Sequence, residues 1–160
     1  MILKTMFAGL CALSLVTLGA AQNKVSGTAH CAKPEVQQQV DVSDHPGHSI
    51  SVMQTKCTWS KPLEVEGIKS KDGMDSGLAD MHGAAGTSHG YYVDNMENGD
   101  KAYVHWQGKE GKEGSEGKWT YNGGTGKLKG IKGGGTYKGK RAEDGSMTVD
   151  VEGEYTLATK

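Results

Sequence analysis

The C-terminal part of the chain alternates apolar and polar residues with a period of two. Met147, Val149 and Val151 take one side of this pattern, and hydroxyl or charged side chains stand between them. Successive side chains of a strand point to opposite faces, so the alternation predicts a strand with one buried and one solvated face. Weaker alternation recurs in residues 36–42 and 101–106. The chain is therefore predicted to form a sheet.

Glycine-containing turn signals such as Asn98-Gly99 and Asp144-Gly145 separate these runs. Such pairs supply the positive φ that tight hairpins require. No stretch after residue 21 has the apolar spacing of an amphipathic helix. We predict strands over about 24–32, 35–42, 48–58, 63–67, 76–82, 88–97, 101–108, 117–121, 126–131, 134–139 and 146–158, some of which merge.

An antiparallel sheet of this size in a small domain closes on itself, because closure removes exposed edges. We therefore predict an all-β fold: one antiparallel, eight-stranded, calycin-like β-barrel over residues 22–160. Within it, residues 22–33 are a candidate for a loosely attached N-terminal segment. The polar repeat in residues 108–117 is predicted to be a mobile, solvated hairpin tip.

Residues 1–21 differ from the rest of the chain. Lys4 precedes an apolar run from about Met6 to Leu18, and three small residues follow it. This order is typical of a bacterial Sec-type signal peptide, whereas a membrane anchor needs about 20 apolar residues and a charged stop. We expect cleavage after residue 21 and a periplasmic or secreted protein without stable membrane insertion.

Two cysteines, Cys31 and Cys57, remain after this leader. In an oxidising compartment they are expected to form one disulfide. Closing a loop of this length would stabilise the fold by roughly 3 kcal/mol in the chain-entropy model. A redox or metal-binding thiol pair is the alternative, which the absence of a C-x-x-C spacing disfavours.

The formal net charge is only −1, so no global field attracts the protein to nucleic acid. Residues 109–141 nevertheless carry nine cations against three anions. These lysines could form a basic face for anionic polymers, but lysines on exposed strands also prevent edge pairing, which is the commoner reason for their presence.

Glycine is concentrated in residues 123–140. A phosphate-binding loop is excluded there because Arg141 stands where a Ser or Thr must hold magnesium. In strands, repeated glycine marks bulges and sharp bends, as at the corners of a small barrel.

The Asn98-Gly-Asp-Lys101 turn, Gly117-Lys-Trp119 and the glycine-rich run from Gly123 to Tyr137 resemble the allene oxide cyclase and dirigent barrel group, in particular its small bacterial exported members. The resemblance covers about residues 55–158. It implies an eight-stranded antiparallel barrel related in shape to lipocalins. In the plant cyclases of this group, an acidic residue and ordered water in an apolar cavity guide the cyclisation of an unstable epoxide, and no counterpart residue is assigned here.

A barrel of eight strands either fills its interior or holds one small ligand. Tyr and Trp combine an apolar body with a polar group and suit a small hydrophobic or amphipathic ligand. We select as cavity-lining candidates Tyr91, Tyr103, His105, Trp106, Trp119 and Tyr137. The alternative is that these side chains form the core, and an interior volume below roughly 100 Å³ would favour it, because ligand pockets usually measure about 300–1,000 Å³.

The sequence Asp44-His45-Pro46-Gly47-His48 places a carboxylate and two imidazoles within one turn. Asp44, His45 and His48 are weak candidates for a metal site. H-x-x-H in a turn without a third ligand is common at protein surfaces, so we expect no metal and no cofactor.

A second set of histidines, His82, His89 and His105, is a candidate to converge at a barrel mouth, with Asp80 or Asp94 as an acid–base group. No nucleophile–base pair is identifiable from spacing. The leading prediction is therefore an exported barrel that binds a small molecule without catalysis. A cyclase- or isomerase-like enzyme and a structural or envelope-interaction protein with a filled barrel are the alternatives, and the oligomeric state is left open.

Overall fold

The computed structural model describes residues 23–157, so the expected signal peptide at residues 1–21 lies outside the described part of the chain. Ten strands and one 3-10 helix follow one another within residues 23–157. They are β1 (Asn23–Cys31), β2 (Val36–Asp41), β3 (His48–Lys61), β4 (Glu64–Val65), β5 (Ile68–His82), β6 (Ala85–Met96), β7 (Lys101–Gly111), β8 (Gly114–Gly124), η1 (Gly126–Leu128), β9 (Lys132–Arg141) and β10 (Met147–Thr156). Among the described residues, no helix is long and apolar enough to cross a membrane.

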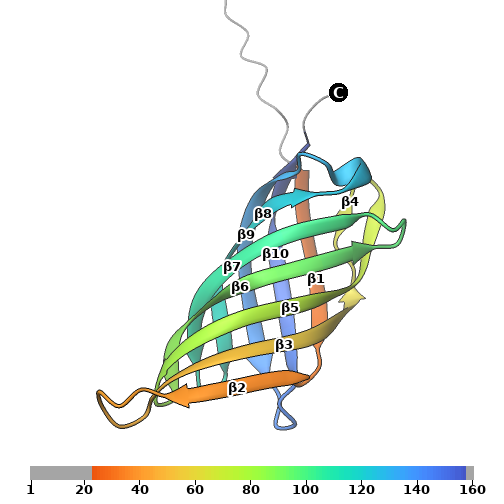
Figure 1. The fold of residues 1–160 in the computed structure, drawn as a ribbon. Helices are drawn as coiled ribbons and strands as arrows, with labels where there is room; N and C mark the ends of the chain where they lie inside the picture. Colours follow the sequence, from red (N-terminus) through yellow and green to blue (C-terminus); the bar gives the residue numbers. More distant parts are fainter. Residues whose placement is uncertain (1–22, 158–160) are drawn as a thin grey trace, which may run out of the picture.

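Eight of the strands close into a barrel in the order β1-β10-β9-β8-β7-β6-β5-β3, and β3 pairs back onto β1 (Figure 1). All pairings are antiparallel. β2 adds to β3, and the two-residue β4 pairs with the start of β5. The predicted all-β, eight-stranded antiparallel barrel is confirmed.

The N-terminal segment is part of the barrel wall. All nine residues of β1 pair with β10, and its last part also pairs with β3. Residues 23–31, which belong to the segment 22–33 considered for loose attachment, are therefore paired along their whole length on one side and over residues 28–31 on both sides. Without β1 the barrel would be open between β10 and β3.

Residues 108–117 form less loop than expected. β7 and β8 continue to Gly111 and Gly114, and only residues 112–113 remain in the turn. The glycines allow the two strands to pair to the tip, so the polar repeat is mostly strand.

Residues 126–131 do not form the predicted strand. They contain η1 and a turn, and Leu128 and Ile131 are only 0% and 2% exposed. Residues three apart lie on opposite faces of a strand, whereas a helical turn brings them to the same side. Both side chains join the core at this end of the barrel.

The Asn98-Gly-Asp100 turn holds η1 in place. Asp100 Oδ2 accepts hydrogen bonds from the Lys127 backbone N–H, at 3.0 Å, and from Asn98 Nδ2, at 2.8 Å. Gly126 has φ +50° and lies so close to the Asp100 carboxylate that a Cβ would overlap it. Two of the motifs that carry the family resemblance thus meet in space and close one end of the barrel.

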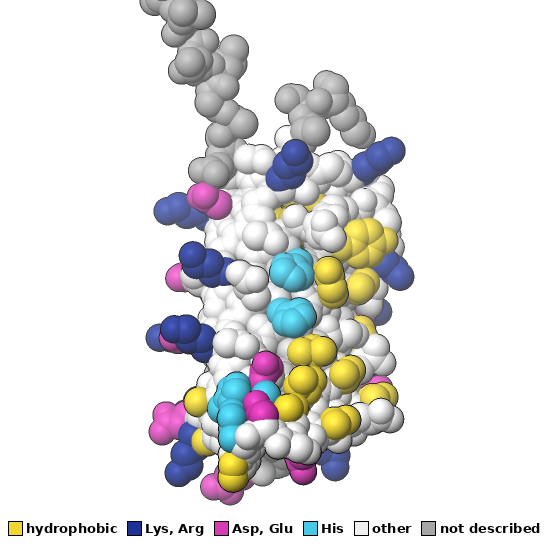
Figure 2. Space-filling view, turned by 60° about the vertical axis from the view of Figure 1, so that its left-hand side comes forward, with side chains coloured by type: hydrophobic (Ala, Val, Ile, Leu, Met, Phe, Trp, Pro, Cys, Tyr) yellow, Lys and Arg dark blue, Asp and Glu magenta, His cyan; other side chains and the backbone are white. Residues whose placement is uncertain are grey.

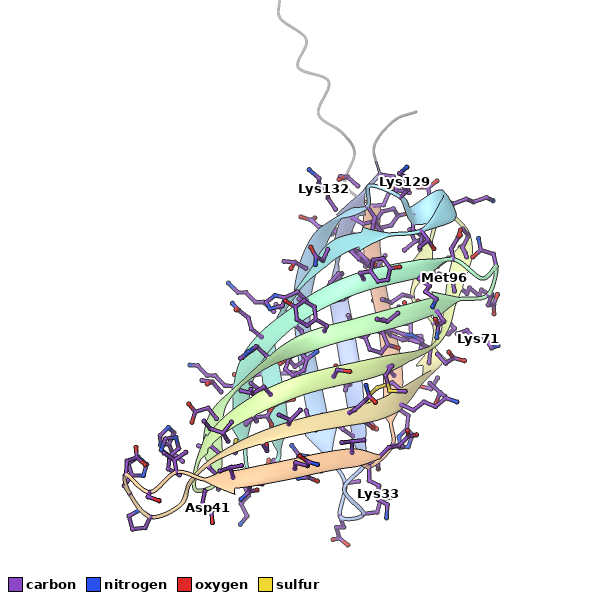
Figure 3. All side chains as sticks on the ribbon, in the orientation of Figure 1. Lys33, Asp41, Lys71, Met96, Lys129 and Lys132 are labelled. Atoms are coloured by element: carbon purple, nitrogen blue, oxygen red, sulfur yellow. A yellow bond between two sulfur atoms is a disulfide. The ribbon has the colours of Figure 1, made fainter. Side chains whose placement is uncertain are left out.

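The apolar core fills the end of the barrel where β4 and η1 lie. Lys129 and Lys132 mark this end in Figure 3, and Lys33 and Asp41 mark the opposite end. The core consists of Val25, Leu63, Val65, Ile68, Met96, Ala102, Trp119, Leu128, Ile131 and Tyr155. The half of the barrel nearest β4 and η1 is therefore filled by packed apolar side chains.

Inside the barrel, glycines make room for aromatic rings. Trp106 lies against Gly77 and Gly90, and a Cβ built on either glycine would come within 2.7 Å of its Cζ2 atom. Rings approach other glycines as closely: Tyr92 at Gly73, Tyr137 at Gly108 and Gly117, and Trp119 at Gly153. Much of the glycine content thus accommodates the large side chains that fill the interior, in addition to forming corners and turns.

The substitution Gly77→Ala is expected to reduce the free energy of unfolding by about 1–3 kcal/mol, because the added methyl overpacks the interior against Trp106. Urea denaturation measures this loss. Gly111→Ala is the matched control, since its Cβ would have no neighbour closer than 3.7 Å. Equal stability of the two variants would contradict the packing described.

The predicted disulfide between Cys31 and Cys57 is confirmed. The two residues face each other directly across β1 and β3, and the bond joins strands that close the barrel. Such bonds are characteristic of proteins outside the cytoplasm. The bond therefore supports an extracytoplasmic protein.

Candidate ligand cavity

A cavity of about 150 Å³ lies inside the barrel. Its lining extends from the aromatic middle of the barrel to the end opposite η1, where Pro34 and Gly145 contribute. The aromatic and ionisable side chains that line it are Trp59, Asp75, Tyr92, Asp94, Trp106, Glu110, Trp119, Tyr121, Tyr137 and Arg141. The wall is thus mainly apolar and carries a few polar groups.

Each interior tryptophan packs edge-to-face with a tyrosine. The ring centroids are 6.3 Å apart for Trp59–Tyr92, 6.1 Å for Trp106–Tyr137 and 5.0 Å for Trp119–Tyr121. Such T-shaped pairs contribute roughly 0.5–1.5 kcal/mol each beyond their burial. The three pairs give the cavity a rigid aromatic wall.

Two of these pairs include a buried carboxyl group. Trp59 Nε1 donates to Asp94 Oδ1 at 2.9 Å, and Trp106 Nε1 donates to Asp75 Oδ1 at 2.7 Å. The Ser70 hydroxyl donates to the other oxygen of Asp94. The cavity therefore contains two similar units, each made of a Trp, a Tyr and an Asp.

Burial raises the pKa of both carboxyl groups to about 6, from 3.8. The hydrogen bonds from Trp106 to Asp75, and from Ser70 and Trp59 to Asp94, oppose this shift. The neighbouring charges of Glu110 and Asp72 add to it. Each group can thus take up or release a proton near neutral pH, as an acid–base group must.

The hydroxyls of Tyr92 and Tyr137 are buried and have no hydrogen-bond partner among the described residues. Burial raises the pKa of Tyr137 to about 12 and that of Tyr92 further still, so both stay protonated. An unsatisfied buried hydroxyl destabilises a fold by roughly 1–3 kcal/mol. Both hydroxyls pack against glycines of the barrel wall, Tyr92 at Gly73 and Tyr137 at Gly108, so a ring must turn toward the cavity before its hydroxyl can bind a polar atom of a guest molecule.

An ion pair lies at the end of the cavity opposite η1. Arg141 Nη2 is 3.2 Å from Glu110 Oε2, and the side chains are 42% and 9% exposed. The Ser88 hydroxyl donates to Glu110 Oε1 at 2.7 Å. Arg141 thus reaches solvent while Glu110 remains inside, which marks where the cavity approaches water.

The structure places three of the six cavity candidates, Trp106, Trp119 and Tyr137, in the lining. The other three lie on the outer surface. Tyr91 and Tyr103 are 56% and 38% exposed, and His105 faces Tyr91 at 5.2 Å between ring centroids. Alternation explains this, because an inward Trp106 forces its odd-numbered neighbours on β7 outward.

The cavity-lining candidates do not include Tyr92 and Asp75, and Asp94 is predicted only as an acid–base group beside the histidines. The register supplies the missing signal: Trp106 pairs with Gly90 across β6 and β7, so the even positions of β6 share its face. Tyr92 and Asp94 follow from this pairing. Asp75 follows from the next pairing, because it stands directly opposite Tyr92 across β5 and β6.

The lysine-rich strands present mixed charge to solvent. They contribute to an open outer groove of about 1,240 Å³ that also includes His89 and His105. Across neighbouring strands, Lys138 pairs with Asp150 on one side and with Glu116 on the other. The outer face therefore alternates cations and anions and is not uniformly basic.

The histidines of the two predicted sets are grouped differently from the prediction. His82 does not converge with His89 and His105 as considered, but lies beside His45 and His48. Figure 2 shows one group of histidine side chains near the lower end of the barrel and further histidine side chains apart from it. Asp44 and Asp80 contact this cluster. Asp80 is thus on the outer surface and Asp94 in the interior, so they serve different sites.

No known protein-family model matches the chain, and no curated protein is significantly similar in sequence. The structure is similar to the pterocarpan synthase dirigent protein GePTS1, with a TM-score of 0.53 and 13% identity, covering 97% of this chain and 100% of that one. The pterocarpan synthase dirigent protein PsPTS1 gives a TM-score of 0.49 and 12% identity, covering 88% and 97%. The likeness to GePTS1 shows that this chain has the dirigent-like barrel fold, which confirms the fold implied by the resemblance.

Proposed function

We propose that the barrel binds one small aromatic or amphipathic molecule in its interior, without transforming it. The observation that carries this proposal is the pair of buried tyrosine hydroxyls without a partner, Tyr92 and Tyr137, in an aromatic cavity. A guest with one polar atom would satisfy one of these hydroxyls and bury its apolar part against the indole rings.

The size of the cavity limits the guest. At about 150 Å³ it exceeds the 100 Å³ at which a filled barrel would be favoured, yet it is smaller than the usual ligand pocket of about 300–1,000 Å³. An apolar cavity of about 150 Å³ in another protein holds benzene. We therefore infer a guest of about one ring, such as a simple phenol.

The direct experiment is titration with phenol and p-cresol, followed by tryptophan fluorescence and calorimetry. Tyr92→Phe and Tyr137→Phe remove a hydroxyl but keep the ring, and the variant that lacks the hydroxyl bound by the guest is expected to weaken binding by about fivefold, the value of one hydrogen bond. Because the free protein loses an unsatisfied buried group, these variants should be at least as stable as the original.

Tyr91→Phe is the matched control, since Tyr91 precedes Tyr92 on the same strand but faces solvent. It should bind phenol like the unmodified protein. Absence of binding at millimolar concentrations of both phenols would disprove the proposal, as would equal weakening by Tyr91→Phe and Tyr92→Phe.

An enzyme that moves a proton on its guest is the second candidate. The raised pKa values of Asp75 and Asp94, both about 6, favour it, and the structural neighbour GePTS1 is described as a pterocarpan synthase. Recovery of a chemically altered molecule after binding, which Asp75→Asn or Asp94→Asn abolishes, would support this candidate over simple binding.

We propose a periplasmic or secreted location for this activity. The disulfide supports it, as does the signal-like composition of residues 1–21. Fractionation of the producing cells, with detection of a chain that begins near residue 22, tests the location.

A further inference from the structure

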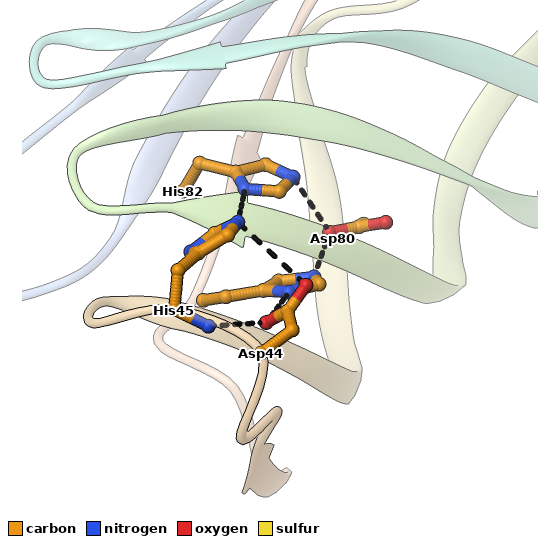
Figure 4. Close-up of polar contacts among 5 residues, drawn as sticks. Asp44, His45, Asp80 and His82 are labelled. Atoms are coloured by element: carbon orange, nitrogen blue, oxygen red, sulfur yellow. Dashed lines mark hydrogen bonds and ion pairs between the residues drawn. The ribbon is translucent and has the colours of Figure 1, made fainter.

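Three histidines from two separate turns converge outside the barrel (Figure 4). His45 lies in the loop between β2 and β3, His48 begins β3, and His82 ends β5. One ring nitrogen of each lies within 4.8 Å of the others. We propose that His45, His48 and His82 bind one divalent transition-metal ion with a preference for imidazole, Zn²⁺ or Cu²⁺.

The backbone brings the three imidazoles together before any ion binds. His48 and His82 are direct partners in the β3–β5 register. The Gly83 N–H donates to the Gly47 carbonyl at 2.8 Å, and the Val42 N–H donates to the His48 carbonyl at 2.9 Å. The two turns are thus fastened to each other, so ligand binding requires little ordering of the chain.

One of the nitrogen–nitrogen distances already suits a tetrahedral ion. His82 Nδ1 and His45 Nε2 are 3.3 Å apart, and two ligands of a tetrahedral zinc with Zn–N bonds of about 2.0–2.1 Å are separated by about 3.3 Å. The His48 ring stacks on the other two, with its centroid 4.8 Å from that of His45 and 4.3 Å from that of His82, so the side chains must rotate to turn their nitrogens toward one ion. The His48 side chain is 12% exposed, whereas those of His45 and His82 are 47% and 53% exposed. An ion could therefore reach the site directly from solvent.

The two carboxylates of the cluster have different roles. Asp44 Oδ1 is 2.7 Å from His48 Nδ1, the position from which a carboxylate orients a metal-binding imidazole and leaves its Nε2 for the ion. Asp80 Oδ1 is 3.0 Å from His48 Nε2 and 3.4 Å from His82 Nε2. Asp80 therefore contacts the ligand nitrogen of His48, which it must release to the ion, and the nitrogen of His82 turned away from His45, from where it can orient that imidazole.

The site is separate from the interior cavity, whose lining includes none of the five residues of the cluster. A bound ion would join the β2–β3 loop to the β5–β6 turn and so clamp one end of the barrel. Metal binding is thus expected to raise thermal stability without changing the affinity for phenol. The result of the metal experiment therefore does not depend on whether the interior cavity binds a small molecule.

The test is calorimetric titration of the metal-free protein with Zn²⁺ and with Cu²⁺. We expect one ion per chain and a higher melting temperature with either ion. His45→Ala and His82→Ala should weaken binding by at least about tenfold, and Asp44→Asn, which removes the orienting carboxylate, by about 10- to 100-fold.

His105→Ala is the control, because His105 is a histidine of the outer groove away from the cluster. It should leave metal affinity unchanged. The Cu²⁺ electron paramagnetic resonance spectrum of the unmodified protein gives a readout that needs no variant, and coupling to several nitrogens is expected. Absence of stoichiometric binding, a spectrum without nitrogen coupling, or equal weakening by His105→Ala and His82→Ala would overturn the proposal.

Discussion

Trp106→Ala is expected to lower the free energy of unfolding by about 3 kcal/mol, in the range found when a large interior aromatic is truncated. The indole fills the space over Gly77 and Gly90, packs edge-to-face with Tyr137 and donates to Asp75. Its removal leaves a void and a carboxyl group without its donor. Urea denaturation followed by circular dichroism measures the loss.

Trp106→Phe separates these two effects, because it keeps an aromatic ring but lacks the N–H group. The Trp106 hydrogen bond holds down the pKa of Asp75, so its loss disfavours the charged carboxylate. We expect the Phe variant to lose more stability at pH 8 than at pH 4, where Asp75 is protonated. An equal loss at both pH values would contradict the hydrogen bond between Trp106 and Asp75.

The barrel was predictable because its signals are local. Alternation and Asn-Gly or Asp-Gly turns recur along the chain, and a small antiparallel sheet with many strands has few ways to avoid open edges. The error at residues 126–131 has a physical cause. Leu128 and Ile131 close the barrel end, and the Asp100 contact that holds this turn joins residues distant in sequence, which no local pattern reveals.

The candidate site was less predictable, because it depends on strand register. Selecting aromatic residues by type does not distinguish Tyr91 from Tyr92, although one faces solvent and the other the cavity. The pairing of Trp106 with Gly90 across the β6–β7 hairpin makes that distinction, because it turns the even-numbered residues of β6 inward. Predicting the histidine cluster requires a contact between residues even further apart in the sequence. His82 joins His45 and His48 only because β3 pairs with β5.

The same buried carboxyl groups predict a protein that loses stability as the pH rises. The pKa values of Asp75 and Asp94 rise from 3.8 to about 6 on folding. Between these pH values the folded state binds more protons than the unfolded state, so the free energy of unfolding falls with rising pH. Well below pH 4 the two carboxyl groups are protonated in both states, and their stabilising contribution is fully present. Above about pH 6 this contribution is lost. Each carboxyl group changes the stability by about 3 kcal/mol over this window.

Asp94→Asn isolates one of these contributions. The amide oxygen can still accept from Trp59, and the amide nitrogen can donate to the Ser70 hydroxyl, so the polar contacts of Asp94 are retained. The variant cannot ionise. The free energy of unfolding of the variant, relative to that of the unmodified protein, should therefore rise by about 2 kcal/mol from pH 4 to pH 7. Denaturation at half-unit pH intervals gives this difference directly and cancels the effects of other carboxyl groups, among them Asp44 and Asp144, whose pKa values are lowered by hydrogen bonds.

A difference that stays constant with pH would mean that Asp94 is ionised in the folded barrel throughout this range. The acid–base candidate would then lose one of the two carboxyl groups on which it rests.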